Sequence, residues 1–84
     1  MSFATEEAAR DSARSIMAEC SARVCHALRQ EMARCRPDEE RIAGLRFVEE
    51  RLRIERSAVF AGHPEAIAKA RFFYGLLLKQ VYYL

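Results

Sequence analysis

Two prolines divide this chain into three segments, and each proline stands at a place where a helix can begin. Pro37 is followed by three acidic residues, and Pro64 is followed by one. Proline lacks only an N–H group that would be unpaired in the first turn of a helix, and acidic side chains favour the positive end of the helix dipole. Gly62 can adopt the left-handed conformation that ends the preceding helix. The pattern predicts a single domain, residues 1–84, with helices at about 5–34, 37–61 and 64–83.

The composition supports a small all-α protein with a packed core. Hydrophobic residues make up 51% of the chain and charged residues 31%, which excludes an intrinsically disordered protein. Three glycines, two prolines and no asparagine are too few turn formers for an all-β protein. The net charge of +2 gives little long-range attraction to nucleic acid or to a membrane surface.

The cysteines and the amino-terminal residues indicate a reducing compartment. The chain has three cysteines, an odd number, and Cys20 and Cys25 point about 140° apart on the first predicted helix. No apolar segment of a secretory signal occurs near the amino terminus. The uncharged run Phe72–Leu78 is much shorter than the roughly 20 residues of a membrane-spanning helix. We therefore expect a cytoplasmic protein with free thiols and no membrane span.

The first two predicted helices carry apolar residues at helical spacing. The first has one stripe, made of Ala9, Ala13, Ile16, Met17, Cys20, Val24, Ala27, Leu28, Met32 and Cys35. The second has two apolar faces about 130–140° apart, which are Leu45, Val48, Leu52 and Val59, and then Phe47, Ile54, Ala58 and Ala61. A helix with two apolar faces needs two packing partners. These are either the other two helices, or one of them and another polypeptide.

The third predicted helix is apolar on more sides than so small a domain can cover. One broad face, which we expect to pack on the other helices, is formed by Ile67, Ala70, Phe73, Tyr74, Leu77, Val81 and Leu84. Phe72, Leu76 and Tyr83 lie on the opposite side of the helix. In a three-helix monomer this side faces water, and an exposed aromatic patch of this kind usually marks an interface.

These patterns predict an antiparallel three-helix unit with a long first helix, which assembles into a homodimer or a small hetero-complex with another protein. The expected function is that of a non-enzymatic protein–protein interaction module, such as an adaptor, co-chaperone or regulator, that docks through the third helix and the second face of helix two. The predicted partner-binding residues are Phe47, Ile54, Phe72, Phe73, Tyr74, Leu76 and Tyr83. The sequence contains no motif that points to a catalytic site, a cofactor or a bound metal.

An enzyme is one alternative class. The three helices resemble the small all-helical chorismate mutase fold, an intertwined dimer. This resemblance implies two arginines about five turns apart on the first helix and a glutamate or glutamine late in the third, where only Gln80 is available. Arg10, Arg14, Arg23 and Arg29 provide no pair at that separation.

A helical DNA-binding regulator is the other alternative class. A short turn that contains Gly62 joins the second and third helices, as in a helix-turn-helix motif. The third helix, however, presents aromatic and aliphatic residues rather than the Arg, Lys, Asn or Gln that read base edges. We therefore expect no nucleic-acid partner.

The first two helices also resemble a known helical hairpin. Leu28–Arg34, a short turn, and the apolar positions of Leu45–Leu52 and Ile54–Val59 are similar to the hairpin of small type III secretion needle co-chaperones, the E-component family. The likeness is a pattern of hydrophobic and charged residues over less than half of the chain. This chain has Pro37 at the turn, where the family has glycines, and a strongly apolar third helix. The resemblance implies a cytoplasmic protein that pairs with a helical-repeat co-chaperone to keep a needle subunit soluble.

Overall fold

The computed structural model describes the backbone of residues 3–82 and the side chains of residues 6–79. Over this range the chain forms α1 (Phe3–Met32), α2 (Glu39–Phe60), α3 (Pro64–Lys69), a π-helical turn η1 (Ala70–Tyr74) and α4 (Gly75–Tyr82). The last three elements follow one another without a break and form the third predicted helix. The regular structure of the described residues is therefore entirely helical, which confirms the predicted all-α class.

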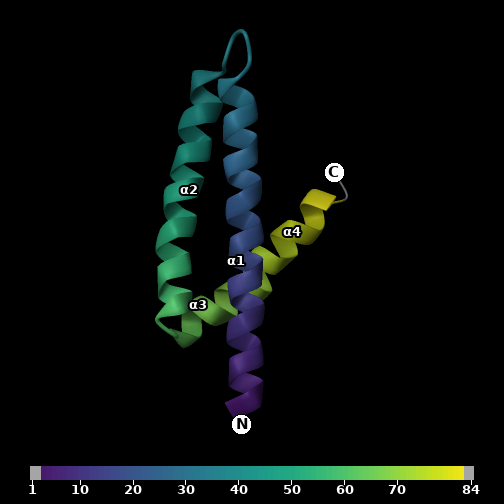
Figure 1. The fold of residues 1–84 in the computed structure, drawn as a ribbon, viewed down its shortest axis with the longest axis vertical. Helices are drawn as coiled ribbons and strands as arrows, with labels where there is room; N and C mark the ends of the chain where they lie inside the picture. Colours follow the sequence, from purple (N-terminus) through teal and green to yellow (C-terminus); the bar gives the residue numbers. More distant parts are fainter. Residues whose placement is uncertain (1–2, 83–84) are drawn as a thin grey trace.

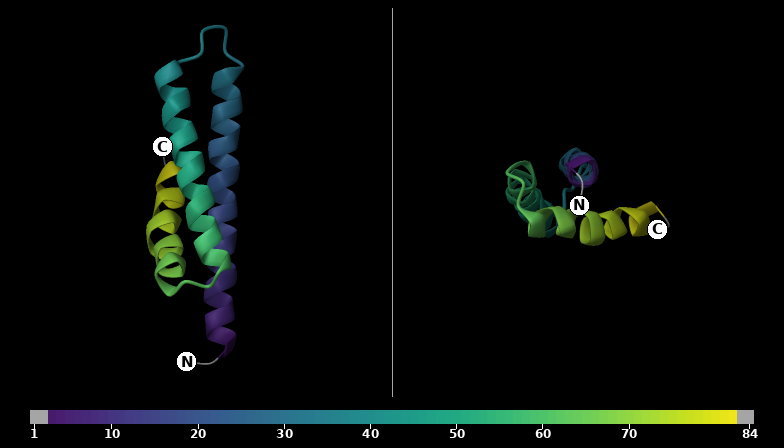
Figure 2. Two further views of the ribbon diagram at one scale, coloured as in Figure 1. Left: turned by 90° about the vertical axis from the view of Figure 1, so that its left-hand side faces the viewer. Right: turned by 90° about the horizontal axis from the view of Figure 1, so that it is seen from below.

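The helices form a hairpin with a crossing rod. α1 and α2 lie side by side and antiparallel, while the rod of α3, η1 and α4 crosses one face of this hairpin obliquely (Figure 1). The rod begins beneath α2, passes α1 and ends beyond it, as the view from below shows (Figure 2). The first turns of α1 extend past the end of α2 (Figure 1). The molecule is thus flat and elongated, 53 × 26 × 15 Å, and a flat packing leaves one side of each helix uncovered.

The boundaries of α2 and α3 follow from local capping. Asp38 Oδ1 accepts hydrogen bonds from the N–H groups of Glu40 and Arg41, at 3.0 and 3.1 Å. The prediction that Pro37 is the first helical residue is wrong, because Asp38 is the N-cap and the helix begins two residues later, at Glu39. At the second break the prediction is confirmed. Pro64 is the first residue of α3, and Gly62 has a φ of +82° in the left-handed region.

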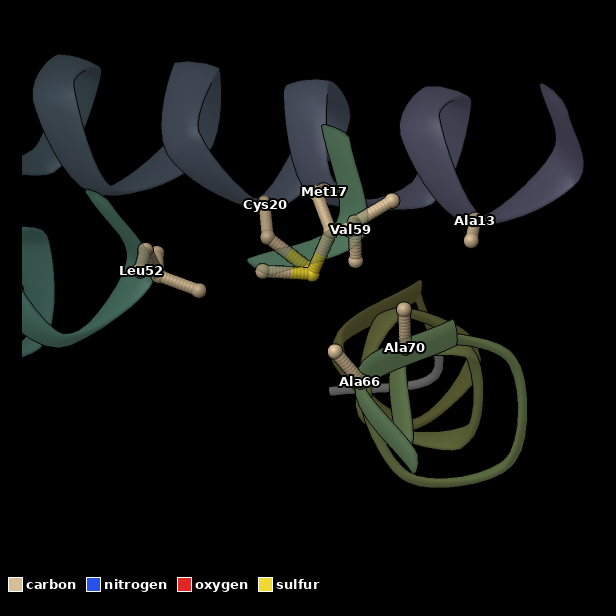
Figure 3. Close-up of a cluster of buried hydrophobic side chains, with 7 residues drawn as sticks. All are labelled: Ala13, Met17, Cys20, Leu52, Val59, Ala66 and Ala70. Atoms are coloured by element: carbon tan, nitrogen blue, oxygen red, sulfur yellow. The ribbon is translucent and has the colours of Figure 1, made fainter. Parts of the chain in front are cut away.

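The core is small and is built mainly from small side chains. The buried hydrophobic residues are Ala13, Met17 and Cys20 from α1, Leu52 and Val59 from α2, Ala66 from α3 and Ala70 from η1 (Figure 3). Met17 and Val59 are the largest side chains among them that are fully buried. The alanines let the rod approach the hairpin closely. None of the described aromatic side chains belongs to this buried set, so the bulk of the aromatic surface lies elsewhere.

Two buried carboxylates hold the ends of the hairpin. Glu31, which is 3% exposed, pairs with Arg34 at 2.9 Å and with Arg41 at 3.4 Å across the turn between α1 and α2. Glu55, which is 7% exposed, pairs with Lys69 at 2.9 Å and also with an arginine one turn earlier on α2. A buried carboxylate needs such partners because its unpaired desolvation costs several kcal/mol. The Glu55–Lys69 pair therefore attaches α3 to α2 in one orientation.

The π turn sets which residues of the rod face the hairpin. In this turn the N–H of Gly75 donates to the carbonyl of Ala70, five residues earlier. Ala66 and Ala70 are buried, and Tyr74 and Leu78 pack against the same core, so the inward residues occur at intervals of four. With 3.6 residues per turn, such a row drifts around a regular α-helix. The wider π turn compensates for this drift and keeps the row on the hairpin.

This change of register corrects one sequence prediction. Phe73 and Leu77 were expected on the inner face of the third helix, at regular helical spacing. They are 53% and 41% exposed, because the π turn keeps Tyr74 on the core and brings Leu78 inward in place of Leu77. The exposed apolar surface of the rod is therefore larger than the periodicity alone indicates.

Candidate functional site

Among the described residues, four exposed apolar side chains lie close together on the rod. Phe72 and Phe73 come from η1, and Leu76 and Leu77 from α4, with exposed fractions of 67%, 53%, 58% and 41% in that order. We call these four residues the C-terminal patch. Phe72 and Leu76 are separated by four residues, as are Phe73 and Leu77, so the two pairs lie on adjacent turns. The patch is a continuous strip along one helix.

The patch has a fixed scaffold beneath it. Tyr74 is half-buried against the core and packs its ring edge-to-face with Phe73, with 5.2 Å between the ring centroids and an angle of 85°. Burial, together with the nearby Glu55 carboxylate, raises the pKa of Tyr74. Gly75 lies against Ile16 of α1, where a Cβ atom would be 3.5 Å from Ile16 Cδ1. The inner side of the rod is thus held on the hairpin while its outer side stays open.

A cationic side chain lies next to the rings of the patch. The guanidinium carbon of Arg71 is 5.4 Å from the centroid of the Phe72 ring, within the range of a cation–π contact. Lys79, three residues after Leu76, is exposed. The described part of the patch therefore combines aromatic and aliphatic surface with positive charge.

A second exposed apolar group lies on α2. Phe47 is 73% exposed and Ile54 is 48% exposed. They are seven residues apart and so lie on the same side of the helix, about 140–160° around the axis from the buried Leu52. We call these two residues the α2 stripe. Beside it, Glu50 and Arg53 form an ion pair of 2.6 Å, and this pair lowers the pKa of the Glu50 carboxyl.

The sequence-predicted binding residues fall into three groups. Phe72, Phe73 and Leu76 lie together in the C-terminal patch, and Phe47 with Ile54 forms the α2 stripe. Tyr74 supports the patch from below, since part of its ring packs on the core. Tyr83 lies outside the described residues. Sequence reasoning missed Leu77 as an exposed residue, and the four-residue spacing of Ala66, Ala70, Tyr74 and Leu78 is the signal that could have revealed it.

Two of the four arginines considered for an enzyme serve the junction between α1 and α2. Arg10 Nη2 donates to the carbonyl of Phe60, the last residue of α2, at 2.7 Å. The guanidinium of Arg14 lies over the Phe60 ring, 4.8 Å from its centroid. Arg23 pairs with Glu19 at 3.0 Å. Arg29 is exposed, and the side chain of Gln80 lies outside the described residues. Arg10 and Arg14 thus act as caps and packing groups at the carboxyl end of α2.

Two open depressions flank the hairpin, one at each end. One, of about 470 Å³, lies at the turn between α1 and α2 and includes Met32, Pro37 and Ile42. The other, of about 660 Å³, lies between α2 and α3 and includes His63 and the Glu55–Lys69 pair. The Glu55 carboxylate already forms ion pairs with the side chains of Arg51 and Lys69. In the described range, no three His, Cys, Asp or Glu side chains are grouped so that they could hold a metal ion.

The three cysteines are free thiols in different environments. Cys20 is buried, and this burial raises the pKa of its thiol. Cys25 is half-buried and donates to Glu49 Oε2 at 3.4 Å, a hydrogen bond that raises the pKa of the Cys25 thiol. Cys35 is exposed in the turn after α1. A raised pKa disfavours the thiolate, so neither Cys20 nor Cys25 has the environment of an activated nucleophile.

Comparisons with known proteins found no relative. No protein-family model matches the chain, and neither the curated proteins nor the solved structures gave a match. Among the described helices, none is long and apolar enough to cross a membrane. The exposed surfaces themselves must therefore carry any inference of function.

Proposed function

We propose that this protein is a non-enzymatic interaction module that docks onto another polypeptide through the C-terminal patch, with the α2 stripe as a second contact. The observation that carries the proposal is the exposure of Phe72, Phe73, Leu76 and Leu77 on adjacent turns of one helix. A contiguous apolar patch of a few hundred Å² is about the largest that a typical monomer exposes, and such a patch is often functional. Aromatic side chains also supply much of the binding energy at interfaces.

The size of the patch agrees with a complex of moderate affinity. If a phenylalanine carries about 200 Å² of surface, the exposed fractions of Phe72 and Phe73 leave about 240 Å² of ring surface in water. Burial of that area contributes about 6 kcal/mol at about 25 cal/mol per Å². Association costs about 4–15 kcal/mol. The two rings alone are therefore near the threshold, and the leucines or the α2 stripe must add to them in a stable complex.

An adaptor, co-chaperone or regulator fits this proposal, in a reducing compartment such as the cytoplasm, where three thiols remain free. We do not base it on the resemblance to the E-component co-chaperones, because that resemblance concerns α1 and α2 only. The C-terminal patch is on the rod, which the resemblance does not cover.

The proposal is tested with a double variant of the patch, Phe72→Glu with Leu76→Glu. Ala18→Glu with Ala22→Glu is the matched control, because it places the same charges four residues apart on exposed positions of α1. Light scattering at micromolar concentration reports self-association, and affinity capture from the native host with mass spectrometry reports other partners. We expect the wild type and the control to form a complex that the patch variant loses. A clean monomer that captures nothing specific, or a complex equally retained by both variants, contradicts the proposal.

A further inference from the structure

We propose that the C-terminal patch fits an apolar surface bordered by carboxylates on a different protein, rather than a second copy of this chain. The inference rests on the docking function proposed above and adds the chemistry of the partner. Its starting point is a charge asymmetry. The sequence contains no aspartate or glutamate after Glu65, whereas Lys69, Arg71 and Lys79 all follow that residue.

The positive charges differ in their availability. Lys69 is bound to Glu55 at 2.9 Å and belongs to the junction between α2 and α3. Arg71 lies over the Phe72 ring, at the edge of the patch, and Lys79 is exposed one turn after Leu76. Within the described residues no ion pair involves Arg71 or Lys79. The rim of the patch is therefore basic, and a partner with carboxylates around its own apolar surface would complement it.

A second copy of this chain supplies the wrong charge. Packing of one patch on another would bring Arg71 and Lys79 close to the same residues of the second copy, and like charges across an interface oppose association. Packing of the patch on the α2 stripe of a second copy places the rim near two carboxylates on that side of α2, Glu40 and Glu50. Glu50 beside that stripe is already paired with Arg53 at 2.6 Å. That arrangement offers the rim the exposed Glu40, which occurs in no ion pair among the described residues, whereas a partner with carboxylates around its apolar surface offers several.

A membrane surface also attracts basic apolar helices, but this rod lacks the necessary polar face. Helices that lie in a membrane interface have a strongly charged face, rich in Lys and Arg, opposite their apolar face. Here the side opposite the patch packs on the hairpin through Ala66, Ala70, Tyr74 and Leu78. Only two cations remain beside the patch, so a protein partner is favoured over a lipid surface.

Two designed peptides of about 18 residues test the inference directly. Both form an amphipathic helix with the same leucine and phenylalanine anchors, and they differ only in their flanking positions, which are glutamates in one and lysines in the other. Fluorescence anisotropy measures their binding to the full chain at low and at physiological salt. Arg71→Gln with Lys79→Gln neutralises the rim, and Arg29→Gln with Arg46→Gln is the matched control at exposed positions on α1 and α2.

We expect the glutamate peptide to bind about ten-fold more tightly than the lysine peptide at low salt, with a smaller ratio as salt screens the charges. The ratio should fall to about two-fold or less in the rim variant and persist in the control variant. Equal affinities, or no binding of either peptide, overturn the inference. Tighter binding to anionic phosphatidylserine vesicles than to the glutamate peptide overturns it in favour of a lipid surface. A homodimer that Phe72→Glu with Leu76→Glu dissociates also overturns it but leaves the proposed interaction module intact, so the two failures are distinguishable.

Discussion

Replacement of Phe72 by alanine should leave the stability of the isolated protein almost unchanged, whereas replacement of Val59 by alanine should destabilise it strongly. Phe72 is 67% exposed, so the fold covers only about a third of the ring. Full burial of a phenylalanine contributes about 1.5–3 kcal/mol, and a third of that is about 0.5–1 kcal/mol. Alanine has the higher helix propensity by a few tenths of a kcal/mol. The two effects nearly cancel, and the net change should be within about 0.5 kcal/mol.

Val59 is the opposite case. It is 1% exposed and packs in the core with Met17 and Leu52. Its truncation removes two buried carbons, each worth about 0.8 kcal/mol, and leaves a cavity that adds to the loss. We expect the free energy of unfolding to fall by about 2–3 kcal/mol. For a domain of this size that corresponds to a decrease in Tm of about 8–24 °C.

Urea unfolding followed by far-UV circular dichroism measures both changes. The experiment is run at several protein concentrations, because a homodimer makes the midpoint depend on concentration. A Phe72→Ala variant that loses as much stability as Val59→Ala would refute the exposure of the patch. If that loss grew with protein concentration, the ring would be covered by a second copy. If it did not, the ring would be covered within the monomer.

Three further predictions concern local structure and pH. Gly44→Ala in the interior of α2 should stabilise the protein by about 1 kcal/mol in urea unfolding, since no atom lies within 4 Å of the new Cβ and alanine favours the helix. Gly62→Ala should lower the free energy of unfolding, because the φ of +82° at this position strains a residue that has a Cβ atom. Asp38→Ala removes the cap of α2 and should lower the free energy of unfolding by about 1 kcal/mol, while Asp38→Asn should retain most of it. The pKa values of Cys20 and Tyr74 are both raised in the folded protein, mainly by burial, so folding favours their protonated forms. This stabilisation is complete below the ordinary thiol pKa of about 8.5 and is lost as the pH rises above it. The urea midpoint of the wild type should therefore drop between neutral and alkaline pH. In a Cys20→Ala, Tyr74→Phe double variant the same rise in pH should lower the midpoint less.

The sequence predicted the elements of this protein because the signals for them are local. The apolar stripe of α1, the stop at Gly62 and the start at Pro64 each depend on residues within a few positions of one another. The small error at Pro37 has the same local character, since two adjacent residues compete to begin α2 and the carboxylate of Asp38 takes the cap. The exposure of Phe47 and Ile54 also agrees with their place on the second apolar face of α2.

The tertiary structure decided how the third helix is placed and what it exposes. Two contacts between distant segments decide whether that helix lies along the hairpin or crosses it. One is the close approach of Ala66 and Ala70 to α1, and the other is the Glu55–Lys69 ion pair. The register of the helix depends on the π turn, which keeps a row of residues at intervals of four on the core. Periodicity within one segment contains no information on the partner of that segment. For this reason the sequence alone determined that the third helix is too apolar to be covered, while only the packed structure determined that Leu77 joins Phe73 among the residues left in water.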